Sequence, residues 1–115
     1  MDMILARGGP PAPPYHPEIR YRELKMDPYK RVCSLGGKRL SLTPTEFSIL
    51  QALLESLGTP VSLRELAERV WDDAVYISRG DSIAVHIRHL RQKLNDTAKP
   101  FRYVKTVWGV GYRIG

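Results

Sequence analysis

The chain has 115 residues, 43% of them hydrophobic, which is enough for one small core plus a tail and too short for two full domains. Its single cysteine, Cys33, excludes an intramolecular disulfide, and its three histidines are too scattered for a zinc site of the usual Cys/His spacing, so we expect no metal and no cofactor. No apolar run approaches the ~20 residues of a membrane span, and the first residues do not form a secretory signal, so we expect a cytoplasmic protein without a membrane partner.

The net charge of +6 is concentrated in the last third of the chain. Residues 79–115 contain eight Lys/Arg and two Asp/Glu, whereas residues 1–78 contain ten of each. A polyanion is the natural partner of such a segment, and nucleic acid fits better than a membrane because the basic helix described below is not a broad basic amphipath. A basic isoelectric point without functional meaning is the alternative that charge alone leaves open.

The first 18 residues are predicted to form a tail or linker. Residues 7–17 contain five of the nine prolines, which favour extended conformations over helix. From residue 19 on, β-branched and aromatic residues alternate roughly with polar ones, interrupted by turn signals at Asp27–Pro28 and Gly36–Gly37. We therefore predict a small antiparallel sheet at the start of a folded domain spanning 19–115.

The first helix has a strong start signal. Thr43 is a suitable N-cap, Pro44 fits the first helical position, and Glu46 at N3 completes a capping box. The buried stripe is expected to run to Gly58 and to consist of Phe47, Leu50, Leu53, Leu54 and Leu57.

A second, shorter helix repeats this signal. Ser62 is its expected cap, and Glu65 stands at N3. Its inward-facing residues are expected to be Leu63, Leu66 and Val70.

The third helix, residues 81–94, combines a core stripe with an unusual outer face. At 3.6 residues per turn, the stripe consists of Ile83, Ile87, Leu90 and Leu94. The opposite face consists of Val85, Arg88, His89 and Gln92. Val85 is thus a β-branched apolar residue in the middle of a polar face.

The chain ends with two β-rich runs around the sequence WGVG at residues 108–111, which predict a tight hairpin. A short helix, a connection and a helix with a basic outer face form a helix-turn-helix, and the hairpin would be its wing. The predicted fold class is therefore α+β: a winged helix-turn-helix with an N-terminal antiparallel sheet, three helices and a C-terminal β-hairpin.

In this arrangement the third helix enters the major groove of DNA, and its outer residues meet base edges. Val85 suits the thymine methyl group, and Arg88 suits guanine O6 and N7 or a phosphate. His89 and Gln92 are groove-facing donors without a defined target. The alternative for Val85 is burial under the sheet or a neighbouring loop.

Residues flanking this face are candidates for other roles. Arg91 and Lys93 are placed to reach phosphates, although a surface salt bridge or plain solvation explains them almost equally well. His86 lies at the boundary of the core and is interpreted as a packing residue. Trp71 is expected to face the core, with its indole N–H available to a phosphate. We find no catalytic set of residues and predict no enzymatic activity.

Four motifs resemble one family in order and spacing. LTPTEFSILQALL, VSLRELAERVW, IAVHIRHLRQKL and YVKTVWGVGYRI are similar to the DNA-binding effector domain of OmpR/PhoB-type response regulators over roughly residues 19–115. The resemblance implies a winged helix with a four-stranded N-terminal sheet. It also implies a transcription factor whose third helix reads the major groove while the wing approaches the minor groove.

The resemblance also implies roles for individual positions. Val85, Arg88 and His89 match groove-facing positions. Trp71, Ser82, Arg91, Thr106 and Tyr112 match positions that can touch phosphate. Two cations of the basic last third, Arg79 and Lys93, complete the set assigned to phosphate, and the residues assigned to the wing are Lys105, Trp108 and Arg113. Some relatives have arginine in place of Trp108 and of His89, which leaves minor-groove reading and base preference open.

Partners follow from the same resemblance. The loop that contains Asp72 and Asp73 corresponds to a segment that contacts RNA polymerase in this family, although an acidic solvated loop also explains it. A phosphorylatable receiver domain usually precedes such an effector domain, and we expect homodimers on double-stranded DNA only with that domain. A protein-interaction module and, more weakly, a small hydrolase or nuclease are the competing interpretations.

Overall fold

An antiparallel sheet of four strands opens the computed structural model, which describes residues 18–71 and 82–115. The strands are β2 (Ile19–Tyr21), β3 (Leu24–Asp27), β4 (Val32–Leu35) and β5 (Lys38–Arg39), paired in that order. Alternation along β3 buries Leu24 and Met26, and Met26 pairs with the buried Cys33 of β4. The predicted sheet is confirmed. The turn between β2 and β3, where Arg22 has φ +54°, carried no Gly or Pro signal.

Helix α1 (Pro44–Glu55) begins with the predicted capping box. The Glu46 amide donates to Thr43 Oγ1 at 3.1 Å, and the Thr43 amide donates back to Glu46 Oε1 at 3.0 Å. The stripe from Phe47 to Leu54 is buried as predicted. The prediction for Leu57 is wrong: its side chain is 46% exposed because the helix ends at Glu55.

Strand β6 (Val61–Ser62) leads directly into helix α2 (Leu63–Trp71). The Glu65 amide donates to Ser62 Oγ at 3.0 Å, which confirms Ser62 as the cap. Leu66 is buried and Val70 packs against the core. The prediction that Leu63 faces inward is wrong. Its side chain is 45% exposed, since the first helical residue lies at the rim, next to the C-terminal hairpin.

Helix α4 (Ser82–Lys93) lies against α1 and α2. All four residues of its predicted stripe are buried, including Leu94, which follows the last helical residue. Val85 is 46% exposed, so the alternative in which this residue is buried is wrong.

The C-terminal hairpin consists of β7 (Lys105–Val107) and β8 (Gly111–Arg113). Gly109 in its turn has φ +80°, as the glycine signal predicted. Strand β8 also pairs with β6, which makes a three-stranded sheet in the order β6-β8-β7. The sequence did not predict β6.

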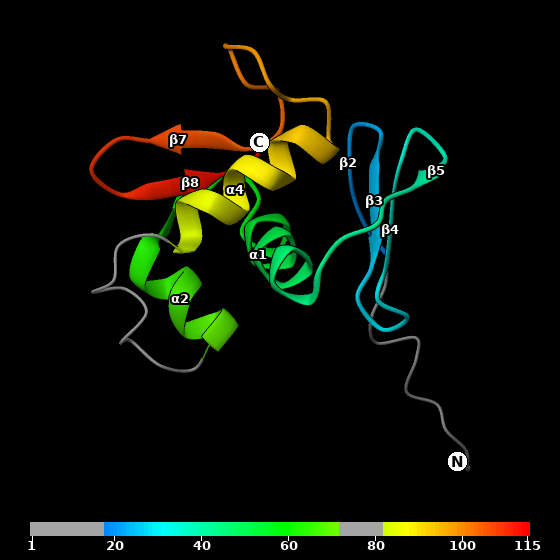
Figure 1. The fold of residues 1–115 in the computed structure, drawn as a ribbon, viewed down its shortest axis with the longest axis horizontal. Coiled ribbons are helices and arrows are strands. Elements are labelled where there is room, and N and C mark those ends of the chain that lie inside the picture. The colour runs from blue at the N-terminus through cyan, green and yellow to red at the C-terminus, as the bar shows by residue number, and fades with distance from the viewer. Residues whose placement is uncertain (1–17, 72–81) are drawn as a thin grey trace, which may run out of the picture.

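Figure 1 shows α1 in the middle of the molecule, with the N-terminal sheet on one side and the hairpin on the other. The core combines side chains from the N-terminal sheet, from α1, α2 and α4, and from the C-terminal segment, which contributes Val104 and Ile114. Among the described helices, none has both the length and the hydropathy that a membrane span requires. Residues 1–17 of the predicted tail (1–18) and the loop with Asp72, Asp73 and Arg79 lie outside the described residues, as do the side chains of Trp71 and Ser82.

Candidate nucleic-acid interface

The outer face of α4 presents the side chains that the sequence singled out. Val85, Arg88, His89 and Gln92 are all exposed. Arg88 and Gln92 line a shallow hollow of about 350 Å³ together with Arg91, Thr97 and Phe101. Because the opposite stripe is fully packed, this face is held rigidly while its apolar and cationic groups remain accessible to a partner.

Arg91 of α4 points toward the C-terminal hairpin and forms hydrogen bonds there. Its Nε and Nη2 donate to the Val104 carbonyl at 3.0 and 2.9 Å, and Nη2 also donates to Thr106 Oγ1 at 2.9 Å. The guanidinium lies 3.7 Å from the centre of the Phe101 ring. Burial lowers the pKa of Arg91, opposed by Tyr112 and Asp96. This residue, predicted as a phosphate ligand, therefore joins α4 to the hairpin, and Thr106 is its partner.

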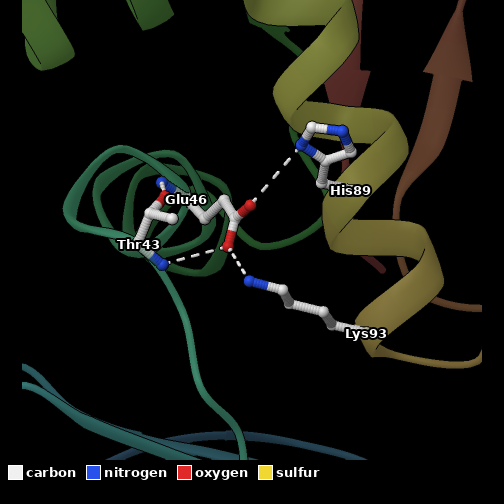
Figure 2. Close-up of polar contacts among 4 residues, drawn as sticks. All are labelled: Thr43, Glu46, His89 and Lys93. Atoms are coloured by element: carbon white, nitrogen blue, oxygen red, sulfur yellow. Dashed lines mark hydrogen bonds and ion pairs between the residues drawn. The ribbon is translucent and has the colours of Figure 1, made fainter.

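Lys93 turns toward the start of α1. Figure 2 shows Lys93 and His89 reaching from α4 to Glu46, whose side chain is 2% exposed. Lys93 Nζ lies 2.6 Å from Glu46 Oε1, and His89 Nδ1 lies 3.8 Å from Oε2. Burial by itself would raise the pKa of Glu46, but the hydrogen bonds from Lys93 and Thr43 outweigh it and lower this pKa. Lys93, predicted to bind phosphate, thus neutralises a buried carboxylate.

His86 is half-buried at the edge of the core, in agreement with its interpretation as a boundary residue. Burial lowers its pKa, with Glu46 opposing and His89 adding to the effect. Among the residues that the structure describes, one group of three potential metal ligands lies close together: Glu46, His86 and His89, with one ligand atom from each inside 4.8 Å of the others. The sequence predicted no metal site because Glu46 lies 40 positions before His86 in the chain.

The hairpin carries the three residues predicted for the wing, of which Trp108 is the exposed one. Trp108 is 86% exposed, Lys105 and Arg113 are half-buried, and Arg113 Nη1 donates to the carbonyl of Gly115. These three residues line a hollow of about 870 Å³. Its other cations were not predicted to belong to a site: Arg22, Lys99 and Arg102. Lys99 and Arg102 belong to the basic last third, but no sequence signal placed Arg22 of the N-terminal sheet beside them.

Asp96 shapes the segment between α4 and β7. Its buried carboxylate accepts backbone N–H groups of Arg102, Tyr103 and Val104 at 2.7, 2.9 and 3.0 Å. The only sequence signal for this role was an acidic residue among cations. The carboxylate positions Val104, whose carbonyl binds Arg91, so it helps to set the wing relative to α4.

Comparison with known proteins identifies the family. The family described as "Transcriptional regulatory protein, C terminal" matches residues 37–114. The regulatory protein VanR of Enterococcus faecium is 54% identical over 82 residues, which are 71% of this chain and 36% of VanR. Response regulator MprA of Mycobacterium sp. (strain KMS) is 32% identical over 112 residues, 97% of this chain and 48% of MprA. The chain thus spans about a third to a half of the length of these relatives.

Solved structures with a similar fold support the same family. The RstA DNA-binding domain of Klebsiella pneumoniae, in complex with the RstA box, superposes with a TM-score of 0.79 at 30% identity, covering 87% of this chain and 98% of that one. The DNA-binding domain of CpxR from E. coli gives 0.74 at 33% identity, with coverage of 85% and 95%. The chain therefore belongs to the family of C-terminal domains of transcriptional regulatory proteins, the winged-helix effector domains of OmpR/PhoB-type response regulators.

Proposed function

We propose that this chain binds double-stranded DNA in a sequence-specific manner as the effector domain of a two-component response regulator. The observation that carries the proposal is the exposed face of α4, where Val85 stands between Arg88 and His89 while the other face of the helix is packed in the core. A similar domain, that of RstA, has been solved on its own DNA box. The family is a class of transcription-regulatory domains, and we propose no enzymatic activity.

In this proposal, α4 lies in the major groove. Val85 contacts a thymine methyl group, Arg88 forms paired hydrogen bonds with guanine, and His89 and Gln92 act as further donors. Phosphate contacts come from Tyr112, from Trp71, Arg79 and Ser82, and from the cations of the wing, where Trp108 lies against the minor groove. Arg91, Lys93 and Thr106 contribute mainly by holding α4, α1 and the hairpin in place.

The test begins with selection of bound sites from a random duplex pool. Affinity for the selected site should then fall steeply with salt, because each neutralised phosphate gives a slope of about −0.9 in a log–log plot. Replacing Arg88 by Ala should cost on the order of 1–3 kcal/mol on that site and flatten the preference at one base pair. Replacing the exposed Lys38 of β5 is the matched control. It should change neither the affinity for the selected site nor the preference at that base pair.

The competing function is a protein-interaction module. It is favoured by the exposed apolar residues Leu63, Trp108 and Val110 around a hollow beside the turn of the hairpin. An affinity for DNA that does not change between low and physiological salt would support this alternative and contradict the DNA-binding proposal.

Three further parts of the proposal rest on the family. The loop with Asp72 and Asp73 contacts RNA polymerase, receiver domains bring two effector domains together on adjacent half-sites, and the protein acts in the cytoplasm. Replacing both aspartates by Ala should change transcription in a reconstituted assay and leave operator affinity nearly unchanged. An equal loss of transcription and of operator affinity would assign the loop a structural role instead.

A further inference from the structure

The two histidines of α4 and the buried glutamate of α1 form a cluster that DNA binding by itself does not require. His86 and His89 are three positions apart, so their side chains leave the helix on the same side. Glu46 approaches from the first turn of α1, and one ligand atom of each residue lies within 4.8 Å of the other two. The rings of His86 and His89 meet edge to face, with centroids 6.5 Å apart.

From this geometry we infer a binding site for zinc(II), or for another borderline divalent transition metal ion, formed by Glu46, His86 and His89. Imidazole and carboxylate are ligands that such ions prefer, whereas calcium and magnesium prefer sites made entirely of oxygen. Three protein ligands with an open fourth position for water are a common arrangement for zinc.

All three distances between ligand atoms lie within 4.8 Å, and the one between His89 and Glu46 is close to the value that an ion needs. Zinc binds nitrogen and oxygen at about 2.0–2.2 Å, so the ligand atoms of a tetrahedral site lie roughly 3.4 Å apart. His89 Nδ1 is 3.8 Å from Glu46 Oε2, and a small rotation of the half-exposed imidazole closes the difference. The buried carboxylate is the fixed ligand, and His89 is the adjustable one.

The surroundings of Glu46 orient the carboxylate for this purpose. Lys93 Nζ and the Thr43 amide both donate to Oε1, which leaves Oε2 on the histidine side (Figure 2). Hydrogen bonds of this kind hold a ligating carboxylate in position. The Lys93 ammonium also repels a cation, so we expect a site of moderate affinity that responds to the metal concentration.

The test is a cobalt(II) titration of the chelator-treated 115-residue chain, without DNA. Tetrahedral cobalt(II) has intense visible d–d absorption, and we expect this signal to saturate at one ion per chain and to disappear when zinc is added. The variants His86→Gln, His89→Gln and Glu46→Gln should each weaken binding at least tenfold, since even residues outside the ligand set change metal affinity by about 10–100-fold. Zinc should also raise the Tm of the wild type, but not that of His89→Gln.

The third histidine provides the matched control. His16→Gln removes an imidazole in the N-terminal region and should leave the titration unchanged. Circular dichroism in the presence of chelator checks the fold of each variant, and the exposed His89 carries the test if His86→Gln does not fold. Absence of tetrahedral absorption in the wild type, its loss in His16→Gln, or wild-type affinity in His89→Gln would overturn the site.

The metal site has a consequence for DNA binding, which rests on the proposed function. If His89 both binds metal and faces the groove, metal and operator compete for it, and the linkage is reciprocal. Zinc should raise the operator Kd of the wild type and of His16→Gln, but not that of His86→Gln, which retains His89. An operator Kd that does not respond to zinc in the wild type would overturn this competition. The DNA-free titration tests the metal site separately from the DNA-binding proposal.

Discussion

Glu46 joins two elements through a single carboxylate. The residue closes the capping box at the start of α1, and the same group binds Lys93 of α4 across the helix interface. A charge buried to this degree is tolerated only when it is paired and hydrogen-bonded, and both conditions are met by Lys93 and Thr43. The position of α4 against α1 therefore depends on the ionised form of this residue.

Replacing Glu46 by Gln should lower stability at neutral pH by about 1–3 kcal/mol, because the charge-assisted hydrogen bond with Lys93 is lost. The native pKa of Glu46 is below its ordinary value of 4.5, so its contribution is fully present above pH 4.5 and is lost as the pH falls through the native pKa. Urea unfolding in the presence of chelator, from pH 7 to pH 3, should show a steeper loss for the wild type than for Glu46→Gln.

The matched control for this experiment is Glu55→Gln. Glu55 also forms an ion pair, with Arg69 at 2.7 Å, but its side chain is substantially exposed, so its effect should stay below about 1 kcal/mol. Equal effects of the two substitutions would contradict a special role for the buried carboxylate.

Val85 provides a second test at the scale of one residue. Since the side chain is exposed, Val85→Ala should change stability by no more than about 0.5 kcal/mol. Its effect on operator affinity should shrink when the facing thymine is replaced by uracil, which lacks the methyl group. Leu90→Ala in the core stripe is the comparison and should cost about 2–5 kcal/mol in stability. If replacing thymine by uracil lowers operator affinity equally for the wild type and for Val85→Ala, the proposed contact between Val85 and the methyl group is wrong.

Between elements, the decisive contact is the one from α4 to the hairpin. Arg91 uses its planar guanidinium to bind a backbone carbonyl and a hydroxyl and to stack on an aromatic ring at the same time. A lysine ammonium cannot reproduce this combination. The angle of the wing relative to α4 therefore depends on a residue that the sequence suggested as a DNA ligand.

Replacing Arg91 by Lys should destabilise the domain by about 1–3 kcal/mol and speed amide hydrogen exchange in β7 and β8, because the Val104 carbonyl and the Phe101 ring lose their partner. Arg88→Lys, on the exposed face of the same helix, is the control and should leave exchange in the hairpin unchanged. Faster exchange confined to α4 would show that Arg91 supports its own helix rather than the wing.

The junction of β6 and β8 is the second contact that positions the wing. Gly111 pairs with Ser62, and a Cβ atom at this position would overlap the Val61 carbonyl oxygen. Gly111→Ala should therefore push the strands apart and lower the Tm strongly. Gly37→Asn is the control, since its added Cβ meets open space and asparagine tolerates a positive φ. A wild-type Tm for Gly111→Ala would contradict the close approach of the two strands.

Across the whole molecule, the two ends of the described chain meet in one basic region. Arg22 from the N-terminal sheet joins Lys99, Arg102 and the cations of the hairpin around the hollow that contains Trp108. Phosphate contacts from this region would add to the affinity of α4 without adding base preference.

Replacing Lys105 by Gln should weaken binding to all duplex sequences to a similar degree and reduce the salt slope by about 1, because one phosphate contact is lost. Lys38→Gln in β5 is the control and should leave the slope unchanged. Salt titrations on the selected site and on a scrambled duplex measure both the loss of affinity and the change in the salt slope. A loss confined to the selected site would assign Lys105 to base reading instead.

The sequence by itself determined the local elements of this protein. Helix starts at Thr43 and Ser62, the stripe of α4 and the glycine turn of the hairpin all follow from interactions within a few residues, which a single segment encodes. The same periodicity placed Val85 on the outer face of α4, and the family motifs identified the arrangement of these elements.

The tertiary structure decided how the side chains of that face are used. The sequence treated Arg91, Lys93 and His89 as parts of one DNA-facing surface, but contacts with Val104 and Glu46 assign the first two to the packing of α4 against the hairpin and α1. Exposure of Leu57 and Leu63 and the pairing of β6 with β8 were likewise not encoded locally. These contacts join residues 13 to 51 positions apart, so only the packing of the helices and sheets against one another determines which charged groups meet.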